Sequence, residues 1–142
     1  MAKGATFSDQ FLKLILNATA IPNIADNASV APLTNLYVSL HTADPTSSGN
    51  QTTNEVSYTG YTRVAVARTS GGWSVSGNTF DPVSTIVFPA CTGGSATATF
   101  AMIGTALSGT GENLWSGPIT PSIAISNGVI PELTTASMGT ET

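Results

Sequence analysis

The chain has 142 residues, of which 41% are hydrophobic and only 8% are charged, and its formal net charge is -4. This charged fraction is about a third of the usual one, so Ser, Thr, Asn and Gly must supply most of the polar surface. The four Lys and Arg residues give no basic stripe for a nucleic-acid backbone, and a single cysteine excludes an internal disulfide.

The N-terminal segment holds the one convincing helical pattern, over residues 8–16. Ser8 is a natural N-cap, and Asp9 places a negative charge in the first turn, where the helix dipole favours it. A helix this short is marginal in water, so its apolar face needs a docking partner, either the domain's own core or a partner subunit. The residues assigned to this face, and hence to a candidate subunit interface, are Phe7, Phe11, Leu14 and Ile15.

The same segment could be mistaken for a secretion signal. We expect neither a signal peptide nor a membrane span, because Asp9 and Lys13 interrupt the short apolar run. Residues 22–35 are rich in Asn, Ala and Pro and are expected to be a linker. This pattern divides the chain into residues 1–35 and residues 36–142.

From residue 36 onward the hydrophobic pattern has period two. Residues 36–41 alternate apolar and polar side chains, which predicts a half-buried strand ending at His41. Residues 44–54 begin with Asp-Pro and are expected to form an exposed, mobile polar loop. A strand is expected over residues 63–67, and a Gly-Gly turn then leads into a strand over residues 73–78.

The second half of the chain repeats this alternation. Further strands are expected over residues 85–88, 95–104, 113–117 and 122–126. Asn127-Gly128 is the strongest hairpin signal and leads into Val129 and Ile130. No helical pattern separates these strands, so the sequence predicts an all-β domain with a short N-terminal helix, either a jelly-roll-like β-sandwich or a barrel.

The one candidate catalytic residue is His41. It lies three residues before Asp44, a spacing at which Asp44 could orient the imidazole as a general base. The sequence offers no nucleophile in a recognised context such as a GxSxG elbow. We therefore interpret His41 as a strand-end residue and Asp44 as a turn residue, and expect no enzyme activity. One histidine and one cysteine give no metal pattern, so no catalytic, metal or cofactor-binding residue is assigned and no cofactor is expected.

Aromatic residues offer an alternative site chemistry, because β-sandwich proteins commonly stack sugars on exposed rings. The residues available for such a glycan site are Tyr58, Tyr61, Trp73 and Trp115. The competing interpretation, which we prefer, places Trp73 in the core and the tyrosines at sheet edges or a subunit contact.

Several stretches resemble a family of small virion proteins of tailed bacteriophages. They are LYVSLHTADP (36–45), NEVSYTGYTRVAVAR (54–68), GGWSVSGN (71–78), FPACTGGSAT (88–97) and SNGVIPEL (126–133). The likeness covers nearly the whole chain, and family members are labelled tail fibre protein or capsid decoration (cement) protein. The resemblance implies a structural protein located in the virion, with no catalytic motif.

Of these two positions in the particle, we prefer capsid decoration, because the chain shows no repeat or heptad pattern from which to build a fibre shaft. Residues 1–35 would then form an N-terminal helix and arm, and residues 36–142 the β-sandwich. The resemblance implies the major capsid protein as partner, with self-association as a homotrimer. The charge and the N-terminal pattern lead us to expect neither nucleic acid nor membrane as a partner. A tail fibre or a receptor- or glycan-binding tail component is the alternative.

Overall fold

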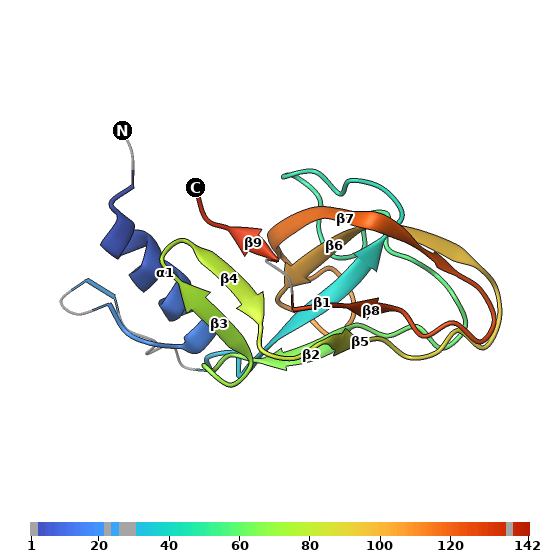
Figure 1. Ribbon diagram of the computed structural model, residues 1–142, viewed down its shortest axis with the longest axis horizontal. Coiled ribbons are helices and arrows are strands. Elements are labelled where there is room, and N and C mark those ends of the chain that lie inside the picture. Colours follow the sequence, from blue (N-terminus) through green and yellow to red (C-terminus); the bar gives the residue numbers. More distant parts are fainter. Residues whose placement is uncertain (1–2, 22–23, 26–30, 136–137) are drawn as a thin grey trace. The chain divides into compact units, whose positions relative to one another are not determined.

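The computed structural model describes residues 3–21, 24–25, 31–135 and 138–142 (Figure 1). The chain forms two compact units, each assembled from separated segments. The first unit consists of Met1–Asn35, Val66–Thr85 and Thr134–Thr142. The second unit consists of Leu36–Ala65 and Ile86–Leu133. Residues 1–35 therefore share their unit with two later segments of the chain.

Short antiparallel strands dominate both units. The elements are α1 (Ala5–Asn17), β1 (Asn35–His41), β2 (Val64–Ala67), β3 (Trp73–Ser76), β4 (Thr79–Pro82), β5 (Ile86–Val87), β6 (Ala96–Gly104), β7 (Asn113–Ile125), β8 (Glu132–Leu133) and β9 (Gly139–Thr140). They form sheets in the orders β2-β1-β6-β7, β3-β4-β9 and β5-β8. The prediction of an all-β fold with a short N-terminal helix is confirmed. The sheets of the described residues are open, which excludes the barrel alternative.

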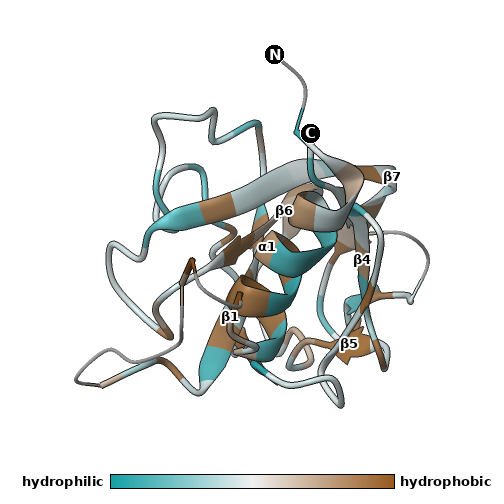
Figure 2. Ribbon diagram, turned by 90° about the vertical axis from the view of Figure 1, so that its left-hand side faces the viewer, coloured by the Kyte–Doolittle hydropathy of each residue, from teal (hydrophilic) through white to brown (hydrophobic). Residues whose placement is uncertain are grey.

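Helix α1 belongs to the first unit and is longer than the sequence predicts. Its N-cap is Gly4, so the assignment of Ser8 as the cap is wrong. Ser8 lies inside the helix and is buried with Leu12 and Leu16, at a spacing that places all three on one side of α1. Figure 2 shows the apolar and polar residues of α1 by colour. The helix contacts β3, a strand of the same unit. Part of the helix is thus docked within its own unit.

Arg68, just beyond β2, fixes the C-terminal end of α1. Its Nε donates to the carbonyl of Ile15 at 2.7 Å, and its Nη2 donates to the carbonyl of Leu14 at 3.1 Å. Nη1 donates to the carbonyl of Leu33 at 2.7 Å. The last carbonyls of a helix have no partner within the helix and carry the negative end of its dipole. The guanidinium therefore satisfies them and ties α1 to the chain that follows β2.

Strand β1 is the second strand of the four-stranded sheet, between β2 and β6. The expectation that it is half buried is wrong for its C-terminal part, because Ser39 and His41 are as inaccessible as the apolar Leu40. Residues 53–56 lie along the C-terminal end of β1, where Glu55 forms an antiparallel bridge with His41. Thr53 contacts the His41 ring, and Val56 donates its N–H to the carbonyl of Leu40 at 3.0 Å.

The structure corrects the predicted strands of the second half. The segments 113–117 and 122–126 belong to one strand, β7, with a register shift in its pairing to β6. Asn127-Gly128 does form a turn, but the chain continues as β8 to pair with β5, so the predicted hairpin is wrong. The N–H of Gly128 donates to the carbonyl of Cys91 at 2.7 Å, which directs the turn toward the chain after β5.

Candidate functional site

The second unit contains an ion pair formed by Arg63 and Glu55. The Arg63 side chain is 3% exposed, and its Nε and Nη2 each donate to one oxygen of the Glu55 carboxylate at 2.8 Å. Two parallel bonds between a guanidinium and a carboxylate form the strongest geometry for such a pair. Hydrogen bonding to Glu55 raises the pKa of Arg63.

The remaining Arg63 donors hold a loop between β6 and β7. Nη1 donates to the carbonyl of Ala106 at 2.9 Å, and Nη2 to the carbonyl of Gly109 at 2.8 Å. Tyr61 completes the cluster, because its hydroxyl donates to Glu55 Oε1 at 2.9 Å and accepts from the Leu40 N–H at 3.1 Å. Burial raises the pKa of Tyr61, which stays protonated at physiological pH. The cluster thus clamps two loops onto β1.

A hollow of about 500 Å³ lies beside this cluster. Its walls come from Thr52, Glu55, Tyr61, Thr62, Arg63, Leu107, Ser108 and Gly109. The charged groups in the wall already bind one another, so the hollow presents mainly hydroxyl groups and the exposed side chain of Leu107. The arrangement supports a structural role for the ion pair.

His41 forms a hydrogen-bonded pair with Ser39, a residue that is not among the expected site residues. The Nδ1 of His41 lies 2.7 Å from the carbonyl of Thr53, so Nδ1 carries the proton and donates. Nε2 lies 2.9 Å from the Ser39 hydroxyl and accepts from it. The signal was present in the sequence, because residues two apart in a strand share a face. Both side chains are 0% exposed, so a substrate has no access to this serine and histidine pair in the folded unit.

Because the His41 imidazole is buried, the free energy of unfolding depends on pH. Burial lowers the pKa of His41, against the opposing effects of the Thr53 carbonyl and the Glu55 charge. Above about pH 6.5 the residue is neutral in both states and the full stability is present. As the pH falls below that value, the unfolded chain takes up the proton first. The free energy of unfolding then drops by up to about 1.4 kcal/mol per pH unit until the folded pKa is reached.

Urea unfolding between pH 7.5 and 5.5 checks this prediction. His41 is the only histidine, so the His41→Gln variant is expected to lose this part of the slope. Equal slopes for the two proteins would contradict a neutral buried imidazole.

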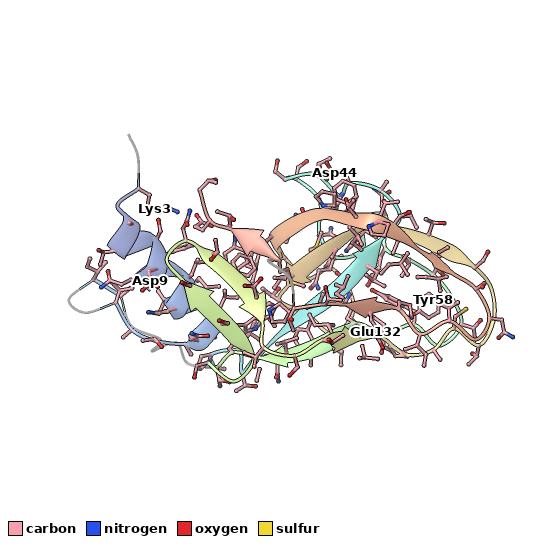
Figure 3. The ribbon with its side chains drawn as sticks, in the orientation of Figure 1. Lys3, Asp9, Asp44, Tyr58 and Glu132 are labelled. Carbon is pink, nitrogen blue, oxygen red and sulfur yellow. The ribbon has the colours of Figure 1, made fainter. Side chains whose placement is uncertain are left out.

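Asp44 does not orient His41. Its Oδ1 accepts the N–H of Thr46 at 2.8 Å, which is the bond of an Asx turn, and Figure 3 shows Asp44 on its loop. The interpretation of Asp44 as a turn residue is confirmed.

The polar loop that follows Asp44 is not fully exposed, because Gln51 is 0% exposed. Its Nε2 donates to the carbonyl of Tyr37 at 3.0 Å, and its Oε1 accepts from Ala106 N at 2.9 Å.

The aromatic residues proposed for a glycan site are mostly used in packing within the protein. Trp73 is 0% and Tyr58 is 6% exposed, which confirms Trp73 as a core residue. The Tyr58 and Tyr61 ring centroids lie 5.3 Å apart, and Tyr61 stacks on Phe88 at 6.3 Å. Trp115 is half buried. Tyr58 and Tyr61 therefore do not form an exposed pair of rings for a sugar.

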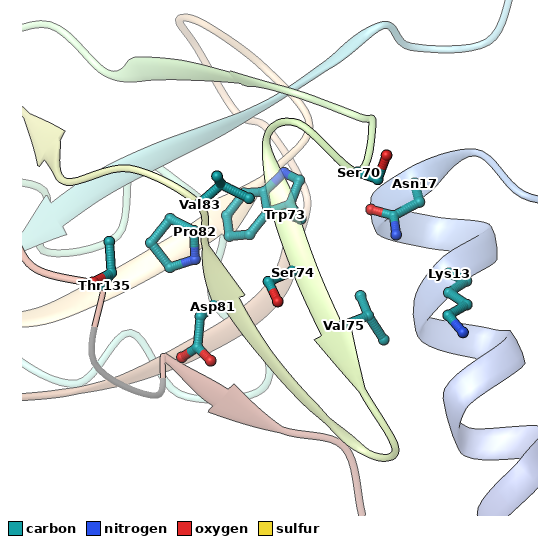
Figure 4. Close-up of a pocket in the computed structure, with 10 residues that line it drawn as sticks. All are labelled: Lys13, Asn17, Ser70, Trp73, Ser74, Val75, Asp81, Pro82, Val83 and Thr135. Atoms are coloured by element: carbon teal, nitrogen blue, oxygen red, sulfur yellow. The ribbon is translucent and has the colours of Figure 1, made fainter.

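The first unit has its own hollow, of about 610 Å³, shown in Figure 4. Lys13 and Asn17 of α1 line one side, and Trp73, Ser74 and Asp81 belong to the strands opposite. Lys13 already pairs with Asp9 at 2.8 Å, and Asp81 accepts the N–H of Met138 at 2.8 Å. The charged residues of this hollow are thus engaged in local contacts.

The helix residues assigned to an interface lie beside the buried side of α1. Phe7 is 40% exposed, and Phe11, Leu14 and Ile15 are half buried. The Phe7 and Phe11 ring centroids lie 6.5 Å apart, and the Lys3 Nζ lies 4.9 Å from the Phe11 centroid. Docking of α1 in its own unit therefore leaves this group with accessible apolar area. Its role in an interface stays a prediction.

Residues 3–21, 24–25, 31–135 and 138–142 contain no group of three or more His, Cys, Asp and Glu side chains placed to hold a metal ion. Within the same residues, no helix has the length and apolar character needed to cross a membrane.

Comparison with known proteins identifies the family. Residues 11–141 match the family described as podophage GP4 fiber I protein gp80. The chain belongs to this family of tailed-phage virion proteins, and the predicted resemblance is confirmed. No curated protein matches the chain. The protein is thus a structural component of a phage virion.

Proposed function

We propose that this chain is a non-enzymatic component of a phage fibre and acts by packing against neighbouring chains of the virion. The observation that carries the proposal is the family match over residues 11–141, because the family's description names a fibre protein. The low charge of the chain agrees with it. A surface with few ionised side chains loses little solvation when it is covered by another chain.

The proposed mechanism is burial of the accessible apolar area on α1. Each fully buried aromatic or aliphatic side chain contributes about 1.5–3 kcal/mol before the costs of association. Phe7 and Phe11 offer the largest side chains of the group. Many copies held side by side in a particle further stabilise one another by mass action.

The absence of enzyme activity is part of the same proposal. Ser39 and His41 are the described residues that come nearest to hydrolytic chemistry, and both are closed to solvent. A substrate would need the core of the second unit to open. This burial supports a structural role for the pair.

Capsid decoration is the second candidate, with the major capsid protein as partner and a homotrimer as the assembly. It is favoured by the lack of a repeat or heptad pattern for a fibre shaft. Immunogold labelling of purified particles distinguishes the two positions. The fibre proposal expects gold at the tail, and gold spread over the head would overturn it in favour of decoration.

A double substitution tests the α1 interface. Phe7→Ser with Phe11→Ser is expected to lower incorporation into particles at least tenfold, because loss of about 1.4 kcal/mol of binding is a factor of ten. Incorporation is measured by mass spectrometry of purified particles. Val83→Ser serves as the matched control, since Val83 is an exposed apolar residue of the same unit, outside α1. Equal incorporation of both variants would contradict the proposed interface.

A further inference from the structure

The C-terminal segment, residues 138–142, is bound along β4 like a short peptide at a sheet edge. Backbone pairing joins Thr140 to Thr79 and Gly139 to Phe80. The N–H of Glu141 donates to the carbonyl of Asn78 at 2.7 Å, and the Asn78 Nδ2 donates to the carbonyl of Glu141 at 3.0 Å. Figure 1 shows the C-terminus at β9. Main-chain pairing of this kind is a common way to bind an extended peptide.

Side chains make this binding specific at both ends of the segment. The Met138 N–H donates to Asp81 Oδ1 at 2.8 Å. The carboxylate of Glu141 pairs with Lys3 Nζ. Between them, Gly139 lies against the Phe80 ring so closely that an added Cβ would overlap the ring. The edge of β4 thus fits a segment with a glycine facing Phe80 and an acidic residue two positions later.

We propose that the edge of β4 also binds the C-terminal segment of a second copy of this chain, so that neighbours exchange β9. A segment supplied by a neighbour has the same sequence and makes the same contacts as the chain's own segment. The effective concentrations of the chain's own segment and of the neighbour's segment decide which of them binds β4. Exchange of a terminal element between copies is a low-cost route to assembly. A net charge of only -4 gives little repulsion between copies.

This inference rests on the proposed function only in requiring copies to lie side by side, and it does not depend on head or tail position. A cysteine pair across the β4 and β9 contact tests it in the purified full-length chain. Thr79 and Thr140 are directly paired, so their side chains are within reach of a disulfide. One copy carries Thr79→Cys, a second copy carries Thr140→Cys, and the two are co-expressed and oxidised.

The expected result is a dimer in which mass spectrometry finds a peptide containing position 79 joined to one containing position 140. Adding Gly139→Val to the copy with Thr140→Cys is expected to lower the yield at least tenfold, since the new side chain overlaps Phe80. Adding Met138→Leu instead is expected to leave it unchanged, because Met138 donates through its backbone.

A single chain carrying both cysteine substitutions is the positive control, and it is expected to form the disulfide within the chain. If this control forms its disulfide and the mixed copies do not, the segment is bound only within one chain and the inference is overturned. Absence of the disulfide in the control would overturn it as well, because the pairing of β9 with β4 would be wrong. Labelling of particles is a separate measurement, so failure of the fibre proposal leaves this result unaffected.

Discussion

Replacing Arg63 by methionine is expected to lower the free energy of unfolding by about 3–5 kcal/mol. Methionine keeps much of the side-chain volume but removes every donor. The Glu55 carboxylate, which is 17% exposed, then loses both bonds from the guanidinium. The carbonyls of Ala106 and Gly109 lose their donors at the same time. Glu55 then keeps only the Tyr61 hydroxyl as a side-chain donor, and a partly buried carboxylate that loses two charge-assisted bonds makes such a change costly.

Denaturant unfolding at neutral pH measures this effect. The control is Lys13→Met, because Lys13 pairs with Asp9 at an exposed site, where a loss of less than about 1 kcal/mol is expected. Combining Arg63→Met with Glu55→Gln is expected to restore part of the loss, since the uncompensated charge disappears. If Arg63→Met lowers the free energy of unfolding no more than the control does, the proposed stabilising role of the Arg63 and Glu55 ion pair is contradicted.

Local alternation predicted most of the central strands correctly. The sequence predicts β1, β2, β3 and β6 because each has several residues in a clear period-two pattern. It does not predict β4, because Asp81-Pro82 argues against a strand, although Pro82 pairs with Trp73 at the strand's end. β9 has only two residues, too few to show any period. Its strand geometry depends on contacts with β4 that the sequence does not reveal.

The candidate site was less predictable than the strands, because tertiary contacts assemble it. Nothing in the spacing of Glu55 and Arg63 shows that their side chains meet, and the carbonyl partners of Arg63 lie in a distant loop. Gln51 lies in a run of Thr, Ser and Asn that is typical of an exposed loop, yet it is fully buried. Only the Ser39 and His41 pair had a local signal, their shared strand face.

Gly104→Ala is expected to lower the free energy of unfolding by about 1–3 kcal/mol through overpacking. Gly104 is the last residue of β6, and a Cβ there would overlap the side chain of Gln51. Gln51 cannot move away cheaply, since its amide binds the backbone of Tyr37 and of Ala106. The backbone angle φ of Gly104 is not in the left-handed region, so the expected cost is steric alone.

Gly117→Ala is the matched control, because Gly117 lies in the neighbouring strand β7 and a Cβ there meets nothing within 4 Å. We expect it to change stability by less than about 0.5 kcal/mol. Gln51→Ala alone is expected to destabilise the chain by leaving its backbone partners unsatisfied. Combining it with Gly104→Ala removes the overlap, so the double variant should be more stable than the sum of the two single losses by about 1 kcal/mol or more. Strict additivity in denaturant unfolding would show that Gln51 does not occupy the space above Gly104.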